Sequence, residues 1–313
     1  MLLADAEHFV RAPGWTWYIL FYFFLAGLSG GSYMIATLLR LRGDRTDEPA
    51  ARLGYYVALP PMLVSPLLLA LDLTQPWRFW HMLWNTTPGE AGPNFKYWSP
   101  MSVGAWALVV FGAITTVSFA EVLVRDRVIR LEFADRAVRL LDGTRGKVFN
   151  AVGAVFGLFI AGYTGVLLSV SNQPVWSDTW ALGGLFLASG LTGSAALLMF
   201  LTRYRPEARA SAGVLEISER MYALLELALI VVFALTLIPA GTLGEVFGFP
   251  WILLWLVAFA GLVPGLGPLV TARLAVTANG AMTVPVTRAA VAAPSLVLLG
   301  VLALRAAVIF SVQ

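Results

Sequence analysis

Apolar stretches alternate with short polar segments along the whole chain. Eight of these stretches contain no Asp, Glu, Lys, Arg or His. Each is close to the ~20 mostly apolar residues that a helix needs to cross a hydrocarbon core of about 30 Å. The pattern therefore predicts eight transmembrane helices, near residues 17–39, 54–72, 101–123, 149–170, 180–201, 220–239, 251–271 and 289–310.

Only the polar sequence Ser171–Pro174 separates the fourth and fifth predicted helices. Without this break, residues 148–202 would form one apolar run much longer than a bilayer is thick. Backbone groups in lipid must be paired within their own segment, so apolar stretches of this length form helices. We therefore predict an all-α polytopic bundle that forms a single integral-membrane domain over residues 1–313.

Lys and Arg are concentrated in alternate loops. The loops after the first, third, fifth and seventh predicted helices hold 17 of them, whereas the opposite side has only Arg11, Arg78 and Lys96. Membrane proteins carry their excess of Lys and Arg in cytoplasmic loops. The asymmetry therefore predicts that both termini lie on the outer side of the membrane.

The composition agrees with a membrane protein. Hydrophobic residues make up 59% of the chain and charged residues 12%, against about 45–50% and ~25% in a soluble domain. The formal net charge of +3 gives too weak a field to attract nucleic acid. We therefore expect contact with membrane lipid and no nucleic-acid partner.

The chain has few residues that hold a redox centre. It contains no Cys, which excludes an iron–sulfur cluster, a thioether-linked haem and a disulfide within this chain. Its two His residues, His8 and His81, lie outside the predicted helices, which excludes a haem buried between them. No metal site, phosphate-binding loop or dinucleotide motif is expected. Any redox role therefore needs a dissociable cofactor in the bilayer and electrons from another subunit.

Polar side chains inside or at the ends of the predicted helices are the next candidates, because such groups are costly in lipid and often functional. They are Tyr22, Asp72, Glu121, Tyr163, Glu226 and Arg305. Glu121 is either an interfacial carboxylate or part of a proton route, and Glu226 is either a proton relay or a paired structural group. Asp72 and Arg305 are expected at the same outer level, where they can form an ion pair.

The longest outer connection, residues 73–100, carries aromatic side chains at helical spacing, namely Trp77, Trp80, His81 and Trp84. This spacing predicts a short interfacial helix, followed by a turn rich in Gly and Pro. The aromatic residues form either an aromatic belt alone or also a docking surface for a partner. The inner loop at 125–147 alternates basic and acidic residues, which predicts a solvated helix.

Glycines at close spacing are expected to let the helices approach one another. The first predicted helix contains Gly27, Gly30 and Gly31, the fourth contains Gly153 and Gly157, and the seventh contains Gly261 and Gly265. Small residues allow close backbone contact where lipid provides no hydrophobic drive for association. They indicate a compact bundle and carry no further functional meaning.

Six short segments follow one another in the order of a known family. They are Leu25–Gly31, Leu71–His81, Trp98–Trp106, Gly162–Leu168 with Gln173–Trp176, and Leu185–Gly190. Their order and spacing resemble the NrfD/PsrC family, the quinone-reactive membrane subunits of polysulfide-reductase-type enzymes. The last three predicted helices match this family only as apolar helices.

The resemblance implies eight spans with outer termini, in agreement with the charge pattern. It also implies a multi-pass protein of the bacterial cytoplasmic (inner) membrane that takes part in anaerobic respiration. Its expected cofactor is a non-covalent quinone, menaquinone or ubiquinone, bound near the outer face. Its expected partners are a four-cluster 4Fe–4S ferredoxin-like subunit and a molybdopterin catalytic subunit. The chain would act as the quinone-reactive subunit of this oxidoreductase and would not be active alone.

The resemblance also implies a set of quinone-binding residues. The tyrosine that contacts quinone on the fourth span corresponds to Tyr163. The histidine and asparagine on the first span correspond to Tyr22 and Ile19, which departs from the family pattern. We therefore expect Tyr163 to bind one ring oxygen, while Tyr22, Asp72 or His81 binds the other or exchanges protons.

Further residues are expected to support this site. Trp15, Trp17 and Phe21 would form an apolar wall for the ring and its isoprenoid tail. Arg78 either orients Asp72 or, together with Trp80, docks the partner subunit. Glu226 and Glu121 are the candidates for a proton route from the cytoplasm.

Two other classes of function stay open. A secondary transporter is favoured by prolines that would interrupt two helices, at Pro60, Pro61 and Pro66 in the second and at Pro264 and Pro268 in the seventh. The other alternative is a structural membrane anchor without a working quinone site.

Overall fold

The computed structural model describes residues 13–275 and 289–313. His8, Arg11 and Arg288 lie outside the described residues, as do the side chains of Pro268 and Arg273. The helices of the described part are α1 (Trp17–Arg42), α2 (Glu48–Leu71), α3 (Pro100–Arg125), α4 (Glu132–Arg139), α5 (Thr144–Ser169), α6 (Leu182–Thr202), α7 (Ala212–Leu237), α8 (Leu243–Phe247), α9 (Ile252–Ala275) and α10 (Ala289–Phe310). Short 3₁₀ helices lie at η1 (Arg45–Asp47), η2 (Pro76–Met82) and η3 (Pro206–Ser211).

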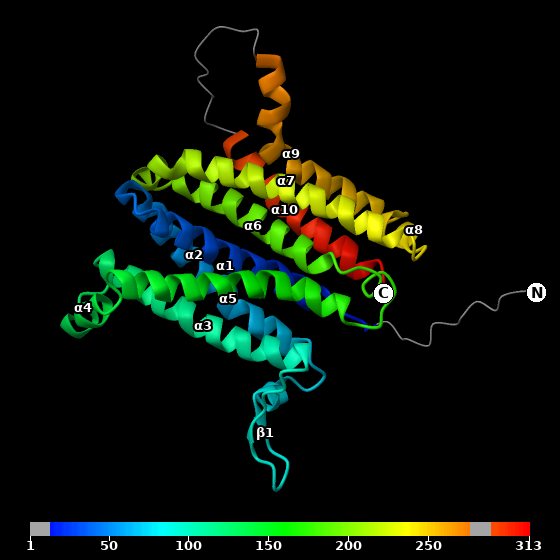
Figure 1. Cartoon of the computed structure of the whole chain (residues 1–313), viewed down its shortest axis with the longest axis horizontal. Helices are drawn as coiled ribbons and strands as arrows, with labels where there is room; N and C mark the ends of the chain where they lie inside the picture. Colours follow the sequence, from blue (N-terminus) through cyan, green and yellow to red (C-terminus); the bar gives the residue numbers. More distant parts are fainter. Residues whose placement is uncertain (1–12, 276–288) are drawn as a thin grey trace, which may run out of the picture.

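Seven helices of the described part are long and apolar enough to cross a membrane: α1, α2, α3, α5, α6, α7 and α10. Figure 1 shows the long helices running side by side along a common direction. The apolar part of α9, Ile252–Gly267, is shorter than these seven. The structure therefore agrees with an all-α polytopic bundle, and the predicted break at 171–174 lies between α5 and α6.

Helix α1 lies at the centre of the bundle, where it contacts α2, α5, α6 and α10. Its contact with α5 is close because both helices present glycine. A methyl group added at Gly157 would lie 2.9 Å from the carbonyl oxygen of Gly30, which is closer than non-bonded atoms pack in a protein interior. The expectation that glycines let these helices approach is confirmed.

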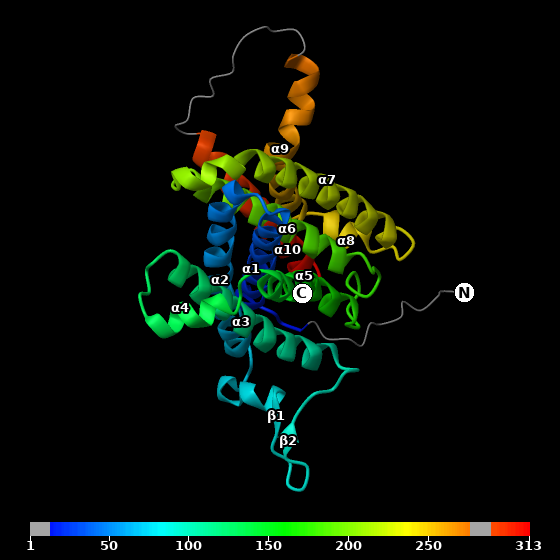
Figure 2. The same cartoon turned by 60° about the vertical axis from the view of Figure 1, so that its left-hand side comes forward.

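Helices α7, α9 and α10 form a second group that packs on α6, and Figure 2 shows α7 and α9 on the side of the bundle away from α3. One face of α7 is buried at intervals of three or four residues, at Leu215, Glu219, Ala223, Glu226, Ile230, Phe233 and Leu237. This spacing is that of a helix face turned toward a core. Two of the seven buried positions on this face are carboxylates.

The prolines of α2 do not interrupt it, contrary to the expectation that they break this helix. Helix α2 continues from Glu48 to Leu71 with three prolines inside it, and α9 is also continuous at Pro264. Proline removes a backbone donor, so the carbonyl four residues before each proline loses its partner within the helix. Two hydroxyls bond to other carbonyls of the same stretch: Ser29 of α1 donates to the Ala58 carbonyl at 2.7 Å, and Ser65 donates to the Pro61 carbonyl at 2.8 Å.

The outer connection between α2 and α3 differs in part from its prediction. The expected interfacial helix is the 3₁₀ helix η2, and Trp84 belongs to a small hairpin that follows it. Strands β1 (Trp84–Asn85) and β2 (Gly92–Pro93) pair antiparallel, with Trp84 opposite Pro93. Figure 2 shows this hairpin projecting from the bundle. The helix predicted in the inner loop at 125–147 is confirmed as α4.

Candidate functional site

Two tyrosines from neighbouring helices lie in the interior of the bundle. Tyr22 of α1 is 1% exposed and Tyr163 of α5 is 6% exposed. Helices α1 and α5 pack directly against each other. The structure therefore places the two tyrosines that the sequence proposed as quinone ligands in the interior, on two adjoining helices.

Tyr163 is held in place on three sides. Its hydroxyl donates to the carbonyl oxygen of Pro100, the first residue of α3, at 2.7 Å. Its ring stacks on Phe159, one turn earlier in α5, with the ring centroids 5.5 Å apart. A methyl group at Gly104 of α3 would overlap the Tyr163 ring, so only glycine fits there. The hydroxyl oxygen keeps a lone pair that can accept a hydrogen bond.

Asp72 lies directly after α2 and faces the start of α1. The Thr16 hydroxyl donates to its carboxylate at 3.5 Å, a long hydrogen bond. Partial burial raises the pKa of the Asp72 carboxyl above its ordinary value, and the bond from Thr16 only partly opposes this effect. Asp72 is therefore a carboxyl group that binds a proton more readily than an exposed aspartate.

His81 lies in η2, on the hairpin side of the site. Its ring stacks on Trp80 with the ring centroids 4.0 Å apart, and its Nδ1 lies 3.2 Å from the Thr86 hydroxyl. Its carbonyl accepts a hydrogen bond from the Asn94 side chain at 3.1 Å. Arg78 and Trp80 are both exposed to the surroundings. His81, Arg78 and Trp80 therefore belong to the connection between α2 and α3 that carries η2 and the hairpin, here called the projecting segment, and not to the pair Tyr22 and Tyr163.

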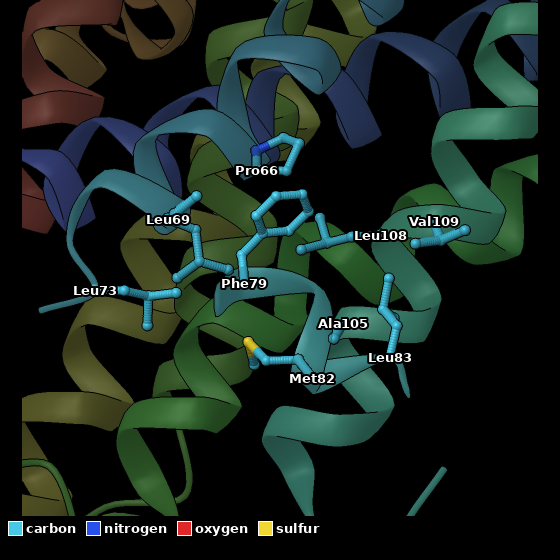
Figure 3. Close-up of a pocket in the computed structure, with 10 residues that line it drawn as sticks. Pro66, Leu69, Leu73, Phe79, Met82, Leu83, Ala105, Leu108 and Val109 are labelled. Atoms are coloured by element: carbon cyan, nitrogen blue, oxygen red, sulfur yellow. The ribbon is translucent and has the colours of Figure 1, made fainter. Parts of the chain in front are cut away.

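An apolar cavity of about 150 Å³ lies between the outer end of α2, η2 and the start of α3. Figure 3 shows its walls, formed by Pro66, Leu69, Ala70, Leu73, Phe79, Met82, Leu83, Ala105, Leu108 and Val109. None of the polar candidates lines it. Three of them are nevertheless sequence neighbours of its walls, because Asp72 precedes Leu73, Arg78 precedes Phe79 and His81 precedes Met82.

A second apolar hollow, of about 430 Å³, lies between α3 and α5. Its walls are Phe95, Val103, Trp106, Ala107, Val110, Val155, Phe156 and Phe159. Phe159 forms the link to the tyrosine pair, because it stacks on Tyr163. The Trp106 indole donates to the Asn94 carbonyl at 3.1 Å, which ties the hollow to the hairpin segment.

The expected apolar wall of three aromatic residues is divided between two places. Trp15 stacks on the fully buried Trp176, with their ring centroids 5.1 Å apart. Trp17 and Phe21 are instead 52% and 37% exposed, and their rings meet edge to face. Trp15 is therefore part of the core, whereas Trp17 and Phe21 face outward from the bundle.

Arg305 of α10 is fully buried. Its guanidinium donates to the Ser189 hydroxyl at 2.6 Å and to the Phe186 carbonyl at 3.0 Å, both in α6. The expected ion pair with Asp72 is wrong, because Asp72 bonds to Thr16 and α10 packs against α1, α6 and α9. Gly27 of α1 leaves space for the Arg305 guanidinium, since a methyl group at this position would lie 2.7 Å from Arg305 Nη2.

Glu226 of α7 is 2% exposed. The burial expected for it in the bundle is confirmed. Its carboxyl group hydrogen-bonds with Thr192 of α6 and interacts electrostatically with Arg305. Its Oε2 atom has no hydrogen-bond partner among the described residues. Because Ser189 and Thr192 lie three residues apart on α6, they lie on adjacent turns of the same helix face, so this face contacts both buried charges.

Glu121, near the C-terminal end of α3, is a buried ion-paired group. It is 3% exposed and accepts from Arg40 at 3.0 Å and from Arg125 at 2.7 Å. It is therefore a paired carboxylate, and its place in a proton route stays a prediction. Unlike Glu226, this carboxylate has two cationic partners.

Several partners of the candidate residues were not predicted from the sequence. Pro100, Thr16, Ser189 and Thr192 each bond to a candidate that lies 20 or more residues away in the sequence. Only the polarity of Ser189 and Thr192 within an apolar helix could have indicated them. The backbone carbonyl of Pro100 leaves no signal in a sequence.

Three curated proteins align with parts of this chain. Protein NrfD of Escherichia coli (strain K12) is 25% identical over 215 residues, which is 66% of this chain and 64% of that protein. A polysulfide reductase component of Wolinella succinogenes is 27% identical over 182 residues, or 57% of this chain and 55% of that protein. A selenate reductase component of Mesobacillus selenatarsenatis is 24% identical over 216 residues, or 60% of this chain and 47% of that protein.

The matches thus span about half to two thirds of the length of these relatives. The family described as "Polysulphide reductase, NrfD" matches residues 6–313, nearly the whole sequence. The chain belongs to the NrfD polysulphide reductase family.

Proposed function

We propose that this chain is the quinone-reactive subunit of a respiratory oxidoreductase in the bacterial inner membrane. It exchanges electrons between the membrane quinone pool and a partner iron–sulfur subunit, and it is not active alone. Family membership supports this proposal, as do relatives named as components of polysulfide and selenate reductases. A four-cluster 4Fe–4S subunit and a molybdopterin catalytic subunit are the proposed partners.

The observation that carries the proposal is the apolar hollow of about 430 Å³ between α3 and α5, whose wall includes Phe159. Ligand pockets are mostly apolar, with a few polar groups that orient the ligand. Here Phe159 stacks directly on Tyr163. The same side chain therefore lines the apolar hollow and contacts the buried phenol. A quinone has an apolar ring and tail and two polar ring oxygens, and the residues present fit such a molecule.

Tyr163 is the proposed ligand of one ring oxygen, with Tyr22, Asp72 and His81 as candidates for the other. Because the Tyr163 hydroxyl donates to Pro100, its oxygen is positioned to accept a hydrogen bond from a hydroxyl of the reduced ring. Asp72 can hold and release a proton at its carboxylate, since partial burial raises its pKa. The bound quinone supplies the two-electron chemistry, and these side chains bind, orient and exchange protons.

The projecting segment is the proposed docking surface for the iron–sulfur partner. Trp77, Tyr97 and Trp98 are 88%, 77% and 67% exposed, and Arg78 and Trp80 lie beside them in the same segment. Tyr and Trp dominate the energetics of many protein interfaces. A partner on this segment would lie close to the quinone site, so no series of haems across the membrane is needed.

We also propose that α9 is an eighth span, that both termini lie outside, and that residues 1–313 act as one membrane domain. A proton route from the cytoplasm is proposed through Glu226, with Glu121 at the inner surface. Glu226 is a candidate proton relay because its Oε2 atom has no hydrogen-bond partner among the described residues.

The test of this function is quinone-dependent turnover of the assembled complex carrying Tyr163→Phe. Dye-dependent activity of the soluble partners reports whether the rest of the complex is intact. A structural anchor or a transporter predicts no change in quinone kinetics, so the same measurement separates these alternatives from the proposal.

A further inference from the structure

A cavity of about 280 Å³, lined by both charged and apolar residues, opens at the inner end of the bundle, between α6, α7, α9 and α10. Its walls are Met199, Arg203, Glu216, Glu219, Pro264, Gly265 and Ala293. Helix α6 ends at Thr202 and α7 begins at Ala212, so the cavity lies beside the loop that joins them. This loop is on the Arg-rich side, which the charge pattern places in the cytoplasm.

Glu219 is a buried carboxyl group in the wall of this cavity. It is 3% exposed, unlike Glu216, whose side chain is 56% exposed and pairs with Arg220 at 3.5 Å. A buried carboxyl group is costly unless it is paired, hydrated or protonated, and Glu219 lines a cavity in which water can reach it.

Glu219 and Glu226 lie on the same buried face of α7. They are seven residues apart, which is about two helical turns and about 10.5 Å along the axis. A methyl group at Gly265 of α9 would lie 2.9 Å from Ala223 Cβ and 3.6 Å from Glu219 Cγ. Ala223 is therefore the buried residue between the two carboxyl groups on this face, and α9 packs closely on it at Gly265.

Polar groups also lie beyond Glu226, on the neighbouring helix α6. The Thr192 hydroxyl donates to the Ala188 carbonyl at 3.0 Å, so its oxygen is left to accept from a protonated Glu226. Charged groups face both carboxyls, with Arg203 and Glu216 near Glu219 and Arg305 near Glu226. The second oxygen of Glu226, Oε2, has no partner among the described residues, which is where a water molecule can bind.

We propose that Glu219 takes up protons from the cytoplasmic water through this cavity and passes them to Glu226. The inference deepens the proposed proton route and rests on it. A hydronium ion in the cavity protonates the Glu219 carboxylate and leaves a water molecule; Glu219 then gives that proton, through water, to the Glu226 carboxylate and returns to its ionised form. No oxidant or reductant takes part in these steps.

The first test is labelling of the wild-type complex in membranes with dicyclohexylcarbodiimide, which reacts with protonated carboxyl groups in apolar surroundings. Mass spectrometry should find the label on Glu219 and Glu226, and labelling should fall as the pH of the inner compartment is raised. This measurement does not depend on quinone turnover. Absence of label on Glu219 would overturn the inference.

The second test is proton uptake from the inner compartment during quinone turnover in vesicles. Glu219→Gln keeps the shape of the side chain but removes its proton, and should slow uptake about 100-fold, the scale of a lost acid–base group. Glu219→Asp should recover most of the rate, and the exposed inner residue Glu207, as Glu207→Gln, should have no effect. Unchanged uptake in Glu219→Gln would overturn the inference. If the wild-type complex showed no quinone turnover, that result would instead overturn the proposed function.

Discussion

Asp72 and Asp44 lie at opposite ends of the bundle, and their surroundings shift the pKa of the two carboxyl groups in opposite directions. Partial burial raises the pKa of Asp72 above its ordinary value of 3.8. Two hydrogen bonds from Thr46, at 2.9 and 2.8 Å, lower the pKa of Asp44. A carboxyl whose pKa is raised on folding destabilises the folded protein when it ionises, and a lowered pKa has the opposite effect.

The pH dependence of stability therefore tests the environment of Asp72. The stability of the wild type relative to Asp72→Asn should fall as the pH rises from the ordinary value of 3.8, because the ionised carboxylate is disfavoured in the fold. The stability of the wild type relative to Asp44→Asn should instead fall as the pH is lowered toward the acid range. Thermal unfolding in detergent across this range measures both. Parallel curves for the wild type and Asp72→Asn would show that Asp72 is not desolvated.

At the scale of helices, glycine contacts decide how closely α1 and α5 approach. We expect Gly157→Ala to destabilise the bundle by about 1–3 kcal/mol, because its methyl group would press on the Gly30 carbonyl at 2.9 Å. Gly112→Ala in α3 is the matched control, since its methyl group would meet only Met62 Cε, at 3.8 Å. That control should be neutral or stabilising by roughly 0.5–1 kcal/mol. Equal effects of the two substitutions on thermal unfolding would contradict the close contact of α1 and α5.

The positions of the helices could be predicted from the sequence because polar breaks bound each apolar stretch. The start of α7 was placed too late, since Glu216, Glu219 and Arg220 lie within its first turns. The continuity of α2 through its prolines could not be predicted, because it depends on the packing of α2 against α1 and α3 and not on the local sequence alone. The aromatic spacing at Trp77–Trp84 indicated a helix, but the turn geometry that forms the hairpin depends on positions such as Gly89, with φ of 87°.

The candidate site was predicted less completely than the helices. The places of Tyr22 and Tyr163 within the bundle could be expected from their positions in two spans and from the family resemblance. The bond from Tyr163 to Pro100 depends on which helices pack together, which apolar patterns do not specify. Arg305 was expected near Asp72 because depth alone was considered, and the packing of α10 on α6 decided its true partner.

At the scale of the whole molecule, the orientation follows from the loop charges. The basic loops would place Arg40, Arg125 and Glu121 at the cytoplasmic surface, where they form ion pairs. The projecting hairpin and the tyrosine pair would then lie at the outer surface.

Reporter fusions test this orientation. A fusion after Gln313 should behave as external, and a fusion in the loop near α4 should behave as internal. An internal signal at Gln313 would mean that α9 does not cross the membrane or that the count of eight spans is wrong.

The central claim is that the outer half of the bundle binds quinone at Tyr163. Tyr163→Phe removes one hydroxyl and keeps the ring that stacks on Phe159. A neutral hydrogen bond contributes about 0.5–1.5 kcal/mol net, so the affinity for quinone should fall roughly two- to tenfold. Tyr204→Phe, at an inner position that is 66% exposed, is the matched control and should leave the affinity unchanged.

The most direct measurement is the quinone concentration dependence of turnover by the assembled complex, with dye-dependent activity of the soluble partners as reference. The proposal predicts a raised KM for quinone in Tyr163→Phe alone, with dye activity intact; a larger fall in kcat would indicate that the phenol also transfers a proton. Identical quinone kinetics in the wild type, Tyr163→Phe and Tyr204→Phe would contradict a quinone site at Tyr163.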